Sequence, residues 1–166
     1  MFKCGDLIVY GNNGVCEVTA VAPLVDSGDD RLYYALRNMV SNGVAYVPVD
    51  SSVYMRPVMS KIEANNLIKE IPNIKTNDFS NVGIRDAARI YRETLQSYDS
   101  LKVLSLIKHI VENGEIKRRL GKKLTSTEER FLEQARRIIE TEIAVALNLS
   151  LEEAAEVILK SINNGG

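Results

Sequence analysis

Residues 2–21 read FKCGDLIVYGNNGVCEVTAV, and this stretch decides the fold. Two apolar runs flank the GNNG sequence at 11–14, whose residues tolerate positive φ angles, so the stretch predicts a tight β-hairpin. If the turn is centred on the two asparagines, Cys16 lies opposite Val9. Two cysteines are too few for a disulfide scaffold, and both Cys4 and Cys16 are expected as reduced, half-buried thiols.

Turn-forming clusters divide the residues after the hairpin into further short segments rich in Val, Tyr and Leu. Turns are expected at 26–30 and 41–43, and strands at 31–37, 44–49 and 53–55. Five short strands at this spacing predict a small, strongly bent antiparallel β-barrel. Pro48 cannot donate to a ladder, so its strand is expected at an edge, where a partner can add a strand of its own.

From Ser60 onward the apolar period changes from two residues to about 3.6, which indicates helices. Capping boxes open three of them, at Ser60 with Glu63, Thr125 with Glu128 and Ser150 with Glu153. A helix at 101–113, capped by Asp99 or Ser100, is expected to stop at Gly114. The remaining expectations are an inward-facing Ile62, a loop at 73–80, a helix at 82–98 and a basic connector at 117–123.

The 166 residues therefore predict an α+β chain of two domains, a β domain at 1–56 and an all-helical bundle of about five helices at 57–166. Residues 1–55 carry more acidic than basic side chains, whereas 85–137 are basic, which favours two surfaces with different partners. The sequence shows neither a membrane-spanning run nor a signal pattern, so a cytoplasmic protein is expected.

Catalytic and metal-binding patterns are missing from the sequence. One histidine, His109, and two cysteines offer no ligand set for a metal ion, and no cofactor is expected. There is no glycine-rich phosphate loop and no nucleophile elbow. The acidic residues are spread over helix faces beside basic ones, as on solvated helices, so the chain is not expected to be an enzyme.

The hairpin and two helical motifs together resemble one family. Gly5-Asp6 followed by the hairpin is similar to the GD-x-V-V-Y-P-x-H-G-V opening of the CarD/CdnL transcription regulators, which the transcription-repair coupling factor shares. Leu124-Thr125-x-x-Glu128-x-x-x-Leu132-x-x-Ala135 resembles the family's L-S-x-x-E-x-x-x-L-x-x-A, and Arg89-x-Tyr91-Arg92-x-x-Leu95 resembles its R-x-Y-K-x-x-L. The family's order, a small Tudor-like β module before helices, matches across the chain.

The resemblance implies a bacterial transcription regulator that acts without strong DNA sequence specificity, and a monomer is expected. Its β domain would bind the β subunit of RNA polymerase by pairing strand edges, and its helical domain would contact promoter DNA at the upstream edge of the transcription bubble, modulating open-complex stability. The implied polymerase-binding residues are Leu24, Gly43, Val44, Ala45, Tyr46 and Val47. The implied DNA-binding residues are Arg85, Ala87, Arg89, Arg92, Lys122, Lys123 and Arg130.

The sequence also departs from the family pattern. The family places a DNA-wedging tryptophan just before its R-x-Y segment, but this chain has no tryptophan, and Ala87 or a neighbour stands there. The hairpin turn lacks the family's Pro and His, and Tyr46 replaces a frequent arginine. Two alternatives stay open: a protein-interaction module without DNA contact, and a free-standing DNA-binding repressor, which would require a recognition helix.

Overall fold

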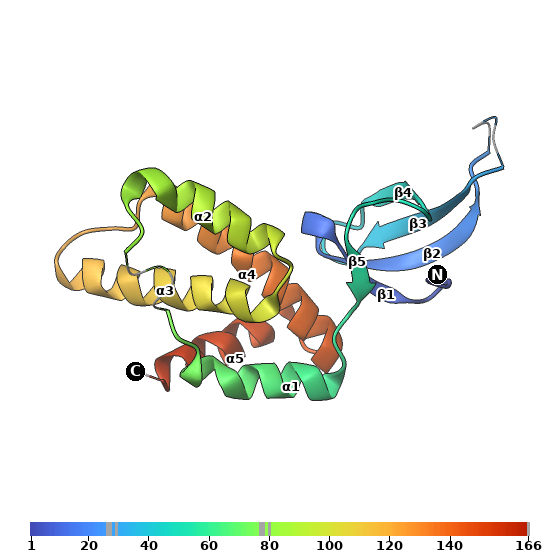
Figure 1. Cartoon of the computed structure of the whole chain (residues 1–166). Coiled ribbons are helices and arrows are strands. Elements are labelled where there is room, and N and C mark those ends of the chain that lie inside the picture. Colours follow the sequence, from blue (N-terminus) through green and yellow to red (C-terminus); the bar gives the residue numbers. More distant parts are fainter. Residues whose placement is uncertain (26–27, 29, 77–78, 80, 166) are drawn as a thin grey trace. The chain divides into compact units, whose positions relative to one another are not determined.

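The computed structural model of the chain describes residues 1–25, 28, 30–76, 79 and 81–165. Within this described part, a five-stranded antiparallel sheet precedes five α-helices, which confirms the α+β class (Figure 1). The chain divides into two compact units, Met1–Met59 and Ser60–Gly166. The turn expected at 26–30 and the loop expected at 73–80 each include residues outside the described part.

The sheet is bent but open. In the described residues its order is β4-β3-β2-β1-β5, so β4 and β5 form the two edges and do not pair with each other. Pro48 ends β4 and lacks the N–H that further pairing would need, and β5 has only three residues. The strands are β1 Leu7–Tyr10, β2 Val15–Pro23, β3 Leu32–Asn38, β4 Val44–Pro48 and β5 Met55–Pro57.

The register of the first hairpin differs by one residue from the expected one. Ile8, not Val9, lies opposite Cys16. The reason is that a three-residue 3-10 turn, η1 (Gly11–Asn13), joins β1 to β2, instead of a two-residue turn. Cys16 therefore points into the core, where burial raises the pKa of its thiol. Cys4 is exposed, with its Sγ 3.0 Å from the carbonyl oxygen of Thr19.

Side chains from one face of the sheet make the core of the first unit. The pairs Ile8–Cys16, Val18–Leu36 and Tyr34–Val47 bring six buried side chains together. Phe2 covers this cluster, with its ring 5.9 Å from that of Tyr34 and its backbone N–H donating to the Tyr34 hydroxyl at 3.1 Å. The opposite face carries the Arg37–Glu17 ion pair and, next to it on β1 and β2, the buried pair Val9 and Val15.

Each helix begins within two residues of where the sequence predicts it. All three capping boxes are formed, and Asp99 caps α3 by accepting from the N–H groups of Leu101 and Lys102. Ile62, expected inside, is 73% exposed, and the small Ala64 is the buried residue of that helix. The helices are α1 Lys61–Glu70, α2 Ile84–Gln96, α3 Ser100–Arg119, α4 Ser126–Leu147 and α5 Leu151–Asn163, with a 3-10 turn η2 at Ile71–Asn73.

The third helix does not stop at Gly114. It continues through Gly114 to Arg119, and the side chain of Leu124 packs on Gly114 so closely that a Cβ there would lie 3.3 Å from it. The real stop is Gly121, with φ +70°. Its N–H donates to the carbonyl of Arg118 and the next N–H to that of Lys117, the paired bonds of a Schellman motif. The connector therefore starts after the helix, and Lys117 belongs to α3.

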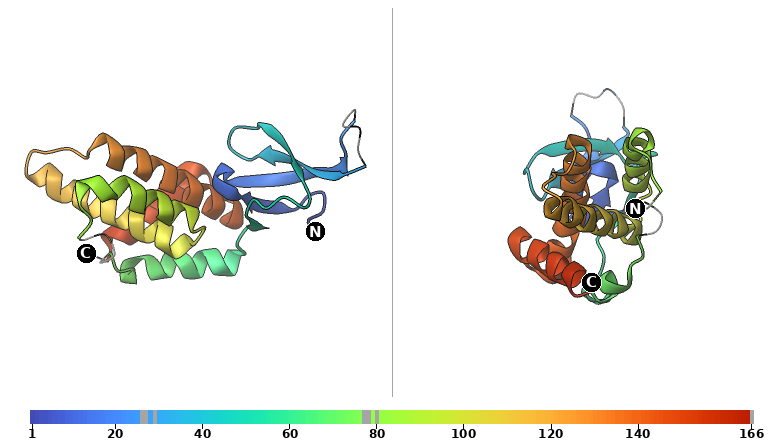
Figure 2. Two further views of the ribbon diagram at one scale, coloured as in Figure 1. Left: turned by 45° about the horizontal axis from the view of Figure 1, so that its top comes forward. Right: turned by 90° about the vertical axis from the view of Figure 1, so that its left-hand side faces the viewer.

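The fourth helix is central to the helical unit, where it packs against α1, α2, α3 and α5. Aromatic rings join α2 to α4: Tyr91 lies 5.7 Å from Phe131 and 6.1 Å from Phe79, whose ring is also 5.4 Å from that of the half-buried His109. Burial lowers the pKa of His109. The first turns of α2 and α4 lie at the same end of this unit, beside the α3–α4 connector (Figures 1 and 2).

Candidate functional site

The fourth strand presents an open edge. Asn38 donates its N–H to the carbonyl of Gly43, and Val49 donates to that of Leu32, so the odd-numbered residues of this segment bond to β3. Backbone groups alternate along an antiparallel strand, so the N–H and C=O groups of Val44 and Tyr46 point away from β3. In the described part of the chain β4 has no other neighbour in the sheet. The edge can therefore accept one added strand.

The implied polymerase-binding residues do not share one environment. Val44 and Tyr46 are 55% and 60% exposed, and Gly43 and Ala45 are also exposed. Val47 is buried in the core, where it packs with Tyr34 rather than facing a partner. Leu24 follows β2 at the end of the sheet opposite to Gly43 and two strands from β4. The edge is thus formed by residues 43–46.

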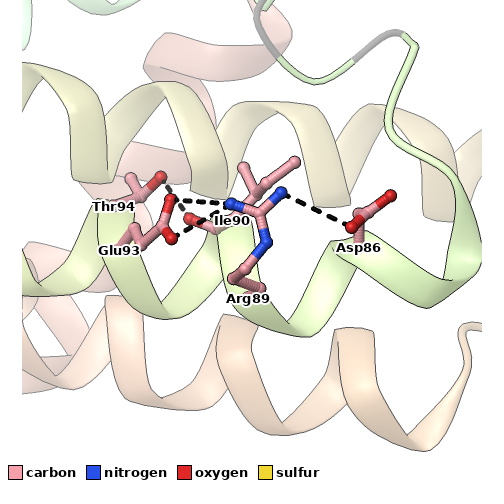
Figure 3. A network of polar contacts seen from close by, with 5 residues as sticks. All are labelled: Asp86, Arg89, Ile90, Glu93 and Thr94. Atoms are coloured by element: carbon pink, nitrogen blue, oxygen red, sulfur yellow. Dashed lines mark hydrogen bonds and ion pairs between the residues drawn. The ribbon is translucent and has the colours of Figure 1, made fainter.

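The basic residues of α2 form one stripe. Arg85, Arg89 and Arg92 follow each other at spacings of four and three residues, so they share a face beside the buried Tyr91. The Arg89 guanidinium lies between two carboxylates, 3.1 Å from Glu93 and 3.4 Å from Asp86 (Figure 3). The hydrogen bonds from Arg89 to Glu93 and then to Asp86 raise the pKa of this guanidinium. Its charge is largely balanced within the helix.

Other basic residues lie at the shared end of α2 and α4. Lys122 and Lys123 are exposed in the connector, and the Arg130 guanidinium lies 4.9 Å from the centre of the Phe131 ring. Within the described residues, no ion pair is formed by Arg85, Arg92, Lys122, Lys123 or Arg130, whose charges remain available to an anion. Two helix N-termini add partial positive charge at this end. This surface suits phosphate groups.

The connector's basic sequence is partly neutralised. Arg118 and Arg119 both bind Glu115, at 2.8 and 3.2 Å, and hydrogen bonds from these two guanidinium groups lower the pKa of Glu115 to about 2. Lys117 binds Glu128 on α4 at 2.7 Å. The run at 117–123 therefore has fewer available charges than its sequence suggests. The charges that remain available are those of Lys122 and Lys123.

An exposed isoleucine lies at the start of α2. Ile84 lies on the same side of the helix as Ala88, Tyr91 and Leu95. It is nevertheless 92% exposed, because it precedes the part of α2 that packs on its neighbours. Ala87, which stands at the expected wedge position, is half-buried and short. The apolar group that projects beside Arg85 is Ile84.

The first unit matches a known domain family. Residues 2–59 match the family model described as the CarD-like/TRCF RID domain. The N-terminal unit is similar to this family over nearly its whole length. The resemblance predicted from the hairpin is therefore confirmed over the whole sheet, and the RID domain is an RNA polymerase-interacting domain. The match ends at residue 59, so the helices lie outside it.

Two further properties of the described residues concern the class of protein. None of the helices found there has the length and apolar character that crossing a membrane requires. Among the same residues, no three or more His, Cys, Asp or Glu side chains are grouped in a way that could hold a metal ion.

Proposed function

We propose that the chain is a non-enzymatic transcription regulator that binds the β subunit of bacterial RNA polymerase through its RID domain and contacts promoter DNA through its helical unit. The match of residues 2–59 to a polymerase-interacting domain carries this proposal. The DNA contact would lie at the upstream edge of the transcription bubble and change the lifetime of the open complex. Polymerase would determine the position, since phosphate contacts carry no base information.

The open edge of β4 supports the polymerase half of the proposal. Val44 and Tyr46 present two N–H and two C=O groups at the edge, as β-strand addition requires. Their exposed side chains lie on the face of the sheet opposite the core, where they can contact side chains of the partner. Pro48 has no N–H, so the added strand pairs with residues before it.

A proline substitution tests this edge directly. Val44→Pro removes an N–H that points away from β3, so it should weaken binding to the purified polymerase β subunit while the sheet remains folded. Val44→Ala is the matched control, because it shortens the same side chain and keeps the N–H. Equal binding by the proline and alanine variants would contradict strand addition at this edge.

The basic end of the helical unit supports the DNA half. Arg85, Arg92, Lys122, Lys123 and Arg130 have available charges, and the exposed Ile84 lies next to Arg85. Proteins that bind the minor groove combine basic side chains with an apolar side chain that enters a base step. Because the chain has no tryptophan, this proposal assigns the role of the inserting apolar side chain to Ile84.

A second candidate function is a polymerase-binding module that does not touch DNA. The balanced charge of Arg89, held by Asp86 and Glu93, favours it, because the central residue of the α2 stripe is already paired. The two candidates differ in how the effect of the protein on promoter-complex lifetime depends on salt. If the helical unit contacts DNA, this effect falls with added salt, and the fall requires Arg85 and Arg92.

A further inference from the structure

Charged residues are absent from three segments of the RID domain. Residues 7–16, 38–49 and 51–55 contain no Asp, Glu, Lys, Arg or His, although 26% of the chain is charged. The segments meet at one end of the sheet, where the η1 turn, the β3–β4 turn and the residues before β5 come together. We call this surface, formed by η1, residues 39–44 and residues 53–54, the uncharged end.

Hydrogen bonds join the three parts of the uncharged end. The Asn38 side chain donates to the carbonyl of Asn13 at 2.6 Å and accepts from the N–H groups of Val40 and Ser41, both at 2.9 Å. On the other side of η1, Gly11 donates its N–H to the carbonyl of Tyr54 at 2.8 Å. The surface is therefore preorganised, which reduces the entropy lost when a partner binds.

Apolar side chains are exposed at this end. Met39, Val40, Val53 and Tyr54 are each about two-fifths exposed, and Val44 is more than half exposed. Depletion of charge together with Met and aromatic side chains is the composition of the centre of a protein–protein interface. Nucleic acid and anionic membrane surfaces would instead require basic residues, which these segments lack.

We propose that the uncharged end is a second part of the docking surface for the polymerase β subunit, the protein that adds a strand to β4. An uncharged, apolar surface of that subunit covers the uncharged end. This inference rests on the proposed function. Val44 belongs both to the uncharged end and to the open edge, so the two surfaces are continuous. A charged group of the partner would be buried here without a counter-ion, which is costly, so the contacting surface is apolar. The affinity of the RID domain is therefore nearly independent of salt.

The test measures binding of the full chain to the purified β subunit of a bacterial RNA polymerase at low and high salt. Val40→Glu and Val40→Lys place opposite charges at the uncharged end, and Tyr46→Glu places one at the open edge. Leu159→Glu is the matched control, since Leu159 on α5 is about as exposed as Val40. Circular dichroism checks that each variant is folded, and sedimentation measures self-association.

Both Val40 variants should lose roughly tenfold or more in affinity, whereas Leu159→Glu should bind as the wild type does. A gain with one sign of charge, or strong salt dependence of the wild type, overturns the inference. If Tyr46→Glu loses binding and both Val40 variants keep it, the inference fails and the proposed function stands. If the wild-type chain does not bind the β subunit, both the inference and the proposed function are overturned. Self-association that Val40→Glu abolishes also overturns the inference, because the occupant is then a second copy.

Discussion

The ammonium group of Lys108, in the middle of α3, lies 2.8 Å from the carbonyl oxygen of Pro72 in η2. It also donates to the carbonyls of Ile74 at 3.0 Å and Ile71 at 3.4 Å. Lys108 is 5% exposed, so a buried charge satisfies three carbonyl groups where the chain leaves α1. These bonds hold η2 against α3, and Gly165 packs directly on Pro72 from the C-terminal side.

Replacement of Lys108 by methionine should destabilise the helical unit. The variant keeps most of the side-chain volume but leaves the buried carbonyls of η2 without their charged donor, and the loss should be about 2–4 kcal/mol. Urea unfolding followed by circular dichroism measures it. Lys102→Met, at an exposed position of the same helix, is the control and should change the stability little. Equal effects of the two substitutions would show that the bonds from Lys108 contribute nothing.

Acid should weaken the contact between α3 and α4 through Glu128. Burial raises the pKa of this carboxyl, but the hydrogen bonds from Lys117 and Thr125 outweigh it and hold the pKa below the ordinary 4.5. A lowered pKa in the folded state means that Glu128 stabilises the fold fully above pH 4.5 and loses this contribution as the pH falls through the lowered value.

The variant Glu128→Gln tests this pH dependence. It should be about 1–2 kcal/mol less stable than the wild type at neutral pH, because the charged bond to Lys117 is removed. The difference should narrow when urea unfolding is repeated below pH 4.5, as the wild-type carboxyl takes up its proton. A difference that stays constant between neutral and acid pH would contradict the role of the ionised carboxylate.

The proposed DNA contact predicts unequal effects along the α2 stripe. Arg85→Gln with Arg92→Gln should shorten the lifetime of the promoter complex and reduce its salt dependence, by a slope of about 0.9 for each phosphate that is no longer neutralised. Arg89→Gln should have a smaller effect, because Asp86 and Glu93 already balance its charge. Arg136→Gln, whose native partner is Glu140, is the control. An Arg89 effect larger than that of the double variant would contradict this order.

Ile84 should matter for the promoter complex and not for folding. Because its side chain is 92% exposed, Ile84→Ser should change the free energy of unfolding by less than about 0.5 kcal/mol. Under the proposed function the same variant should shorten the lifetime of the promoter complex, since serine cannot enter a base step as an apolar side chain does. Ile84→Leu, which stays apolar, should retain the wild-type lifetime. Full activity of Ile84→Ser would exclude this residue as the wedge.

Local sequence signals predicted the elements of the fold but not all of their ends. Capping boxes such as Thr125 with Glu128 depend on neighbouring residues only, and the structure forms them as expected. Gly114 was wrongly expected to end α3, because its role depends on Leu124, which comes to cover it only in the folded bundle. The hairpin register was off by one residue because the turn uses three residues and not two.

The candidate edge was predictable and the hydrogen-bond networks were not. Pro48 indicated an edge strand from sequence, and the sheet order places β4 at an edge. The pairing of Arg89 with Asp86 and Glu93 follows from helical spacing, although sequence alone does not show which arginines remain unpaired. Lys108 and Asn38 bond to residues more than twenty positions away, so only the fold brings their partners within reach.

Pro48 also has a consequence for the free chain. An uncharged edge strand can template the addition of further copies and lead to fibrous aggregates, and natural proteins commonly protect such edges with a short strand or a proline. Here the edge offers outward N–H groups at Val44 and Tyr46. The next outward position is Pro48, which has no N–H group. We therefore expect the residue that limits the length of an added strand to limit the assembly of unoccupied molecules as well.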